Sequence, residues 1–153
     1  MSQSVQVFAD YAAAFEETFA DDDWSRLEQY FAEDARYEIS GGPFATTIDG
    51  RDAILKGLKK SLDGFDRKFD YREIELTSGP TLKATEEGDE IRMTWKVHYR
   101  MNGAPDISLP GGSMLRVNDG VIQLLRDEYN DAELGEIGAW LAEHGAGLDG
   151  SYI

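Results

Sequence analysis

The sequence predicts an α+β domain in which a curved antiparallel sheet wraps around N-terminal helices. Before residue 64, apolar residues recur every three or four positions, which is the spacing of helices. After residue 64, short runs typical of strands are separated by breaks rich in Gly, Pro, Asn and Asp. Such breaks are typical of hairpins, so the strands should pair in antiparallel fashion. We expect residues 1–153 to form a single domain, because that length suits one core and no repeat or linker interrupts it.

The first 64 residues predict the order helix, helix, strand, helix. The predicted elements are a helix over 5–19, a shorter helix over 24–34, a strand over 36–40 and a third helix over about 51–62. Ser4 and Asp49 stand where side chains commonly cap the first turn of a helix. Asp52 follows in the first turn of the third helix, where a negative charge is favourable.

The rest of the chain predicts strands and one more helix. The predicted strands cover 69–77, 82–85, 90–101, 107–109, 114–117 and 121–129, and a last helix covers about 131–143. Long strands do not stay flat, and bends near Gly79 and Gly111 would let the sheet curl around the helices.

The composition excludes several classes of function. Thirty acidic residues against fifteen basic ones leave a net charge of -15, which repels the phosphates of nucleic acids and of anionic lipids. We therefore expect neither a nucleic-acid nor a membrane partner. There is no cysteine, and His98 and His144 lie on different predicted elements, so we expect no metal centre and no metal cofactor. No glycine-rich nucleotide-binding loop is present, and the first ten residues carry no targeting signal, which predicts a cytoplasmic protein.

Three segments carry a resemblance to a known family. Residues 23–35 look like that family's second helix and its exit, 49–54 like the start of its third helix, and 118–129 like its last hairpin and strand. In this order, they make the chain resemble the nuclear-transport-factor-2-like superfamily, in its SnoaL-like, polyketide cyclase-like branch. The resemblance implies a cone with one apolar pocket, an apolar small-molecule ligand and a homodimer.

Alternation along the strand over 90–101 indicates which side chains face the pocket. It places Trp95, Val97 and Tyr99 on an apolar, inward face and His98 on the outward face. On the last strand both faces carry apolar residues, so alternation leaves the choice open there.

The resemblance implies that the face of the last strand bearing Asp127 points into the pocket. The ligand contacts that we expect are Phe15, Phe31, Trp95, Val97, Tyr99, Ser113, Leu125 and Tyr129. A carboxylate among such side chains loses hydration, which raises its pKa and suits it to acid or base chemistry near neutral pH. Asp127 is therefore the candidate catalytic residue, with Tyr37 as the candidate group that orients a substrate oxygen.

Two activities found in the superfamily do not fit the residues. Ketosteroid isomerases need a tyrosine, a carboxylate base and an oxyanion acid, and this chain has other residues at all three positions. They are Phe15 for the tyrosine, Ile39 or Ser40 for the base, and Ser113 for the acid. Limonene-type epoxide hydrolysis lacks its asparagine and its arginine–aspartate pair. What remains is a cyclase, isomerase or lyase that acts on an apolar carbonyl substrate, or a non-catalytic ligand-binding or dimeric assembly module. An open cavity with Asp127 on its floor would favour the first, and a filled one the second.

The homodimer is expected to form through the outward face of the sheet. That face carries His98, Met114, Arg116 and Arg126, and Met114, Ile122 and Leu124 would otherwise form an exposed apolar patch.

Overall fold

The computed structural model describes residues 2–153 and has the predicted α+β composition. Its α-helices are α1 (Gln3–Asp21), α2 (Arg51–Gly64) and α3 (Gly135–His144). Its strands are β1 (Phe31–Ser40), β2 (Thr46–Asp49), β3 (Tyr71–Thr85), β4 (Gly88–Arg100), β5 (Ile107–Asn118) and β6 (Val121–Glu128). Short 3₁₀ helices span Trp24–Tyr30, Asp66–Lys68 and Asp131–Glu133.

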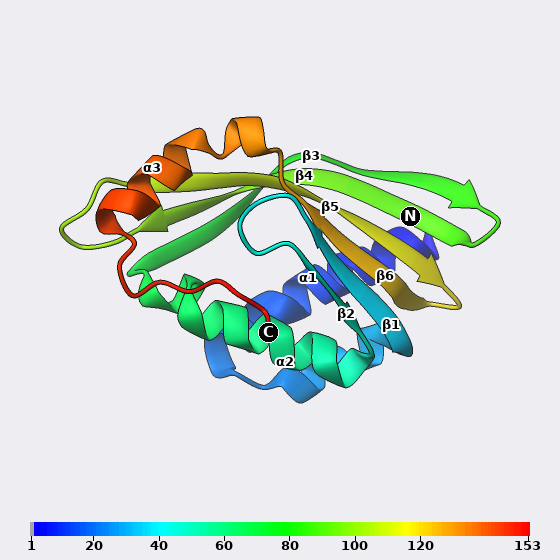
Figure 1. The fold of residues 1–153 in the computed structure, drawn as a ribbon. Helices are drawn as coiled ribbons and strands as arrows, with labels where there is room; N and C mark the ends of the chain where they lie inside the picture. The colour runs from blue at the N-terminus through cyan, green and yellow to red at the C-terminus, as the bar shows by residue number, and fades with distance from the viewer. Residues whose placement is uncertain (1) are drawn as a thin grey trace.

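The strands form one curved sheet in the order β2-β1-β6-β5-β4-β3 (Figure 1). Four of its five strand pairs are antiparallel, as predicted, while β1 and β6 pair in parallel. Parallel neighbours need a long crossover, and here everything from β2 to β5 lies between them in the chain. Helices α1 and α2 lie on the side toward which the sheet curves (Figure 1). The sheet and these two helices surround the interior that holds the candidate site.

Helix α1 begins earlier than predicted. Ser2 has an extended backbone, and its hydroxyl accepts a hydrogen bond from the amide of Val5, so Ser2 is the cap. Ser4, the predicted cap, lies within the helix and is buried. Its hydroxyl donates a 2.7 Å hydrogen bond to Asp89, which ties the start of α1 to β4.

The predicted helix over 24–34 is wrong in its second half. Trp24–Tyr30 is a 3₁₀ helix, and β1 begins directly after it. The helical spacing was misleading because its apolar residues belong to two different elements. Leu27 is the buried residue of the 3₁₀ helix, whereas Phe31 belongs to β1 and pairs with Ile122 of β6. This long-range pairing, which local periodicity does not reveal, ends the helix early.

Asp49 does not cap α2, contrary to the prediction. It ends β2, a strand that the sequence did not indicate, and forms an ion pair with Arg36 of β1 at 2.8 Å. Gly50 occupies the cap position, without a side-chain hydrogen bond. The predicted place of Asp52 in the first turn is confirmed.

Two pairs of predicted strands are continuous in the structure. The segments 69–77 and 82–85 lie largely in β3, and 107–109 and 114–117 lie in β5. Gly111 does not interrupt β5, where it stands opposite Trp95 of β4. A Cβ atom at Gly111 would lie 2.5 Å from the indole ring of Trp95, so the ring can occupy this position only because residue 111 has no side chain.

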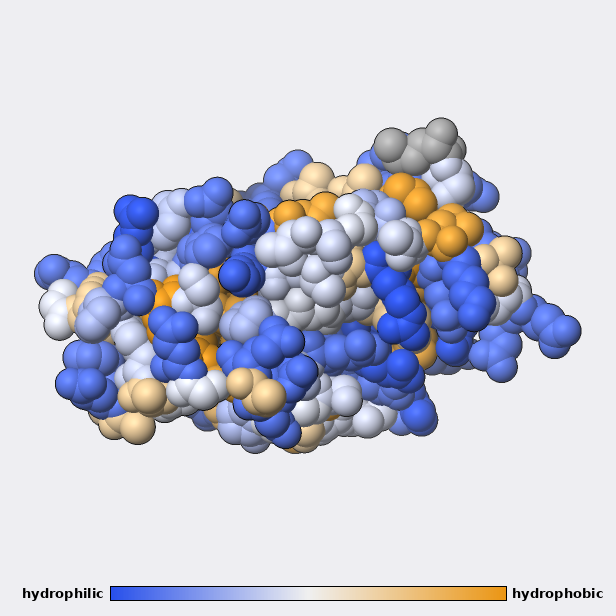
Figure 2. All heavy atoms as spheres, turned by 90° about the horizontal axis from the view of Figure 1, so that it is seen from above, coloured by the Kyte–Doolittle hydropathy of each residue, from blue (hydrophilic) through white to orange (hydrophobic). Residues whose placement is uncertain are grey.

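The outward face of the sheet does not carry the predicted apolar patch. Met114, Ile122 and Leu124 are buried within the single chain. Met114 stands between Arg92 and Arg126 on the neighbouring strands, and long arginine stems cover apolar surface. Seen from above, the molecule is mainly hydrophilic, with separate small apolar areas (Figure 2). The homodimer stays a prediction, which the exposure of these three residues no longer supports.

The last predicted helix, over about 131–143, is a 3₁₀ turn followed by α3. Beyond α3, residues 145–153 return across the molecule to lie along α2 (Figure 1). The amide of Asp149 donates to the carbonyl of Gly64 at 2.9 Å, and the hydroxyl of Ser61 donates to the carbonyl of Gly150 at 2.7 Å. This C-terminal segment therefore forms part of the wall of the interior. Within residues 2–153, no helix is both long and apolar enough to cross a bilayer.

Candidate functional site

The main cavity lies between the sheet and the helices α1 and α2, and has a volume of about 390 Å³. Its wall is mostly aromatic and aliphatic, with contributions from α1, α2, the strands β1 and β3 to β6, and the C-terminal segment. Most of the polar side chains on this wall form two groups. One group surrounds Asp127, and the other surrounds Asp66 and Arg72.

The carboxylate of Asp127 is held by two hydroxyl groups. Tyr37 of β1 donates to its Oδ2, and Ser113 of β5 donates to its Oδ1 at 2.7 Å. The indole Nε1 of Trp95 donates to the Ser113 hydroxyl at 2.9 Å, which fixes that hydroxyl for its bond to the carboxylate. These residues come from four neighbouring strands, so the rigid sheet sets the position of the carboxylate.

Burial raises the pKa of Asp127, while the hydrogen bonds from Ser113 and Tyr37 work in the opposite direction. Burial is the larger effect, so the carboxyl group holds its proton more tightly than an aspartate in water. The pKa of Tyr37 is raised well above its usual value, first by burial and then by the charge of Asp127. Tyr37 therefore remains a neutral donor. Asp127 is the group of this cluster that can change its protonation.

A second polar cluster stands on the same wall. Arg72 of β3 contacts Asp66 at 2.6 Å and Glu16 of α1 at 3.0 Å, and only 5% of its side chain is exposed. The hydroxyl of Tyr99 donates to Asp66 at 3.3 Å. Burial raises the pKa of Asp66, and the charge of Arg72 opposes this. Because two carboxylates already surround the guanidinium, it offers little positive charge to an anionic ligand.

The structure brings most of the predicted site residues to one cavity. The residues on its wall include Phe15, Tyr37, Trp95, Val97, Tyr99, Ser113, Leu125, Asp127 and Tyr129. Phe31 is the exception, because it packs in the core with its ring 5.4 Å from that of Tyr11, and Tyr11 stands on the wall in its place. His98 points outward, as predicted, and contacts Glu75 and Ser108.

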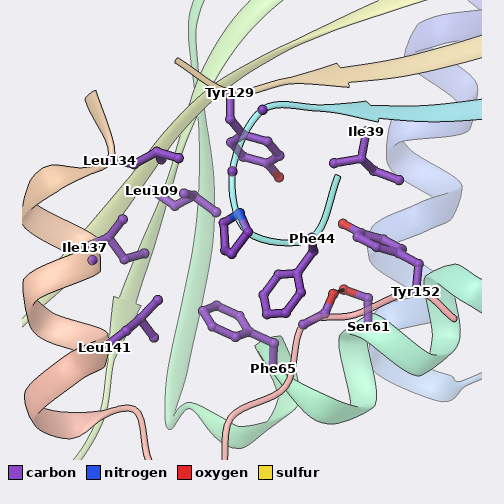
Figure 3. A pocket seen from close by; sticks show the side chains of 15 residues that line it. Ile39, Phe44, Ser61, Phe65, Leu109, Tyr129, Leu134, Ile137, Leu141 and Tyr152 are labelled. Carbon is purple, nitrogen blue, oxygen red and sulfur yellow. Dashed lines mark hydrogen bonds between the residues drawn. The ribbon is translucent and has the colours of Figure 1, made fainter. Parts of the chain in front are cut away.

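The interior is divided, whereas one pocket was expected. A second cavity of about 130 Å³ lies beside α3 (Figure 3). Ser61, Leu109, Tyr129 and Tyr152 line both cavities, so a single layer of side chains separates them. The division arises because the C-terminal segment, whose path the sequence does not indicate, inserts Tyr152 between the sheet and α2.

Four wall residues of interest were not found from the sequence. Tyr11 lies three residues after Phe8 and four before Phe15, so helical spacing could have indicated it. Arg72 shares the inward face of β3 with Ile74, and alternation could have indicated that. Asp66 and Tyr152 lie outside periodic elements and left no signal. Within residues 2–153, no cluster of three acidic or histidine side chains has the arrangement of a metal site.

Solved structures with the same fold have diverse names. A proposed polyketide cyclase from Xanthomonas campestris is 24% identical, with 90% of this chain and 96% of that chain covered and a TM-score of 0.54. An epoxide hydrolase of the limonene type from M. tuberculosis is 17% identical, with coverage of 86% and 82% and a TM-score of 0.56. A Catenulispora acidiphila protein with a ketosteroid isomerase-like fold, in complex with trimethylamine, is 19% identical, with coverage of 92% and 95% and a TM-score of 0.57. At these identities, the likeness establishes the fold alone.

The sequence comparisons identify the family. No curated protein sequence matches the chain. The SnoaL-like domain matches residues 12–124, which include the second half of α1, all of α2, the strands β1 to β5 and the first half of β6. This is the branch that the segments 23–35, 49–54 and 118–129 indicated, and the nuclear-transport-factor-2-like fold of the structural neighbours agrees with it. The chain belongs to the SnoaL-like domain family.

Proposed function

We propose that this protein binds an apolar, carbonyl-bearing small molecule and moves a proton on it with Asp127, as a cyclase, isomerase or lyase. One observation carries the proposal: the carboxylate of Asp127 lies on the wall of a cavity large enough for a small ligand, between the hydroxyls of Tyr37 and Ser113. A carboxylate that is positioned by its surroundings and has a raised pKa is suited to general acid or base catalysis.

The proposed step is proton abstraction next to a carbonyl group. Asp127 takes the proton, and the electrons of the broken C–H bond pass to the carbonyl as an enolate. The same carboxyl group then returns the proton to carbon, or the enolate carbon attacks a second carbonyl of the substrate, whose oxygen takes the proton from Asp127. A carboxylate has about four lone-pair positions, so the two hydrogen bonds that it accepts leave room for the proton.

The substrate must contribute to stabilising the enolate. Tyr37 and Ser113 already donate their hydroxyl protons to Asp127. Tyr11 is one candidate for a donor to the substrate oxygen, since it is buried on the same wall and its pKa is raised, which keeps it protonated. A substrate whose enolate is delocalised, such as an aryl ketone or a 1,3-dicarbonyl compound, needs less help of this kind. The proposed polyketide cyclase among the structural neighbours is consistent with this substrate class.

The test is hydrogen exchange of 2-tetralone in D₂O, followed by proton NMR. The native protein should accelerate exchange of the protons next to the carbonyl, and Asp127→Asn should reduce the acceleration by about 100-fold or more, because the base is lost while the shape is kept. Asp106→Asn is the matched control, since Asp106 lies exposed beside Arg100. Equal exchange with the native protein and with Asp127→Asn would refute the proposal.

The second candidate is a non-catalytic ligand-binding module. It is favoured by the aromatic wall and by the fact that both Asp127 oxygens already have partners. The structural neighbour in complex with trimethylamine gives an example of a bound small molecule on this fold. Binding of 2-tetralone without any accelerated exchange would support this candidate over the enzyme.

A further inference from the structure

The second cavity, beside α3, is a separate feature with its own chemistry. We propose that it is an apolar subsite that takes the non-reacting alkyl or aryl end of a ligand whose carbonyl group lies at Asp127. The placement of the carbonyl rests on the proposed function, whereas the nature of the subsite rests on the cavity itself.

The size and the wall of this cavity define the group that it accepts. Its volume of about 130 Å³ is close to that of engineered cavities of about 150 Å³, which stay dry and bind benzene when lined by Leu, Ile and Phe. Here the wall is formed by similar side chains from several elements. They include Phe44, Phe65, Leu109, Leu134, Ile137 and Leu141 (Figure 3).

The cavity offers no charge to a ligand. Among the described residues 2–153, none of those that line it is acidic or basic. The hydroxyl of Ser61 is already used, because it donates to the carbonyl of Gly150 at 2.7 Å. The other hydroxyls belong to Tyr129 and Tyr152, which stand at the boundary with the main cavity. A polar or charged end group would lose its hydration there without compensation, so the subsite selects a hydrocarbon group.

Tyr129 and Tyr152 form the partition between the two cavities. Tyr129 packs edge-on against Trp95, with ring centroids 5.8 Å apart, and Tyr152 packs edge-on against Tyr37 at 5.5 Å. The hydroxyls of both partition residues point into the space between their two rings (Figure 3). Each ring therefore touches a member of the Asp127 network on one side and the apolar cavity on the other. A ligand that turns either ring aside reaches from Asp127 into the subsite.

The proposal predicts a dependence of affinity on chain length. The probes are the neutral phenyl ketones acetophenone, butyrophenone and hexanophenone, with binding followed by calorimetry. For the native protein, affinity should rise by about fourfold for each added methylene that enters the subsite, from the usual hydrophobic contribution. Leu141→Trp fills the subsite, so the affinity for hexanophenone should fall toward that for acetophenone, which should itself be unchanged.

Two variants separate this idea from its alternatives. Leu148→Trp is the matched control, because Leu148 packs in the same apolar cluster without lining the cavity, and it should keep the chain-length dependence. Tyr152→Ala removes one side of the partition and should strengthen hexanophenone binding relative to acetophenone. Native protein that binds the three ketones equally, or none of them, overturns the subsite, as does Leu141→Trp acting equally on all three. Asp127→Asn should abolish exchange while keeping the dependence on chain length, so a failure of the proposed chemistry is distinguishable from a failure of the subsite.

Discussion

The hydroxyl of Tyr37 donates a hydrogen bond to Oδ2 of Asp127, across the one parallel strand pair of the described sheet. The register places Ile39 opposite Asp127, so Tyr37, two residues earlier on the same face of β1, reaches the carboxylate from the side. The sequence suggested that Tyr37 orients a substrate oxygen, but in this arrangement its proton is used on Asp127. We therefore assign it the role of positioning the carboxylate and tuning its pKa.

Replacing Tyr37 by Phe should shift the pH dependence of catalysis upward. The hydrogen bond from Tyr37 stabilises the ionised carboxylate, so its loss raises the pKa of Asp127 further. The rate of 2-tetralone exchange should rise with pH as Asp127 ionises, and this rise should occur at higher pH in Tyr37→Phe. Tyr71→Phe, which removes an exposed hydroxyl that contacts Glu73, is the control. An unchanged pH midpoint would show that Tyr37 does not act through Asp127.

Asp127 should also make the stability of the protein depend on pH. In the unfolded chain its pKa is near the ordinary 3.8, and in the folded protein the pKa is higher. As the pH rises from about 3.8 through the folded value, the unfolded state releases the proton first, and the free energy of unfolding falls. Asp127→Asn lacks this loss. The free energy of unfolding, measured in urea, should therefore be higher for Asp127→Asn relative to the native protein at pH 7 than at pH 4. The opposite order would contradict the raised pKa.

The sequence was most informative where a side chain's role follows from its own strand. Trp95, Val97 and Tyr99 alternate with outward residues along β4, and all three line the main cavity. Alternation failed on β6, where both faces are apolar, and only the family resemblance selected the face of Asp127. The outward face was misjudged because Met114 is covered between Arg92 and Arg126 of the neighbouring strands, and alternation along a single strand does not show such cover.

What the sequence could not reveal depends on contacts between distant segments. The partition between the cavities requires residues 145–153 to return to α2, and no periodicity encodes that path. Likewise, the pairing of Arg72 with Asp66 and Glu16 joins β3 to a 3₁₀ turn and to α1. Phe31 was assigned to the pocket because a helix was expected there, and as the first residue of β1 it faces the core instead.

Gly64→Ala should weaken the attachment of the C-terminal segment. A Cβ atom at Gly64 would lie 2.1 Å from the carbonyl oxygen of Asp149, so the segment would have to move away from α2. Overpacking of this kind costs about 1–3 kcal/mol, measurable by chemical unfolding. Gly135→Ala is the control, because a Cβ there meets nothing within 4 Å. If Gly64→Ala were as stable as the control, the docking of 145–153 on α2 would be wrong.

The second polar cluster on the cavity wall should stabilise the fold through the charge of Arg72. Arg72→Met keeps an apolar stem but removes the charge that faces Asp66, whose side chain is only 14% exposed. Loss of one partner of a buried ion pair leaves the other uncompensated and costs about 3–5 kcal/mol. Arg36→Met, which breaks an exposed pair with Asp49, should cost less than about 1 kcal/mol.

The double variant Arg72→Met with Asp66→Asn tests the cause of this loss. If the uncompensated charge of Asp66 is responsible, neutralising it should restore part of the stability lost in Arg72→Met. The double variant could instead be less stable than Arg72→Met alone. The contribution of Arg72 would then come from its contact with Glu16 and from its packing over Phe19, where the guanidinium lies 4.6 Å from the ring centre. Chemical unfolding of the four proteins in this cycle distinguishes the two outcomes, because the interaction energy between the two sites is large in the first and close to zero in the second, where the two losses add.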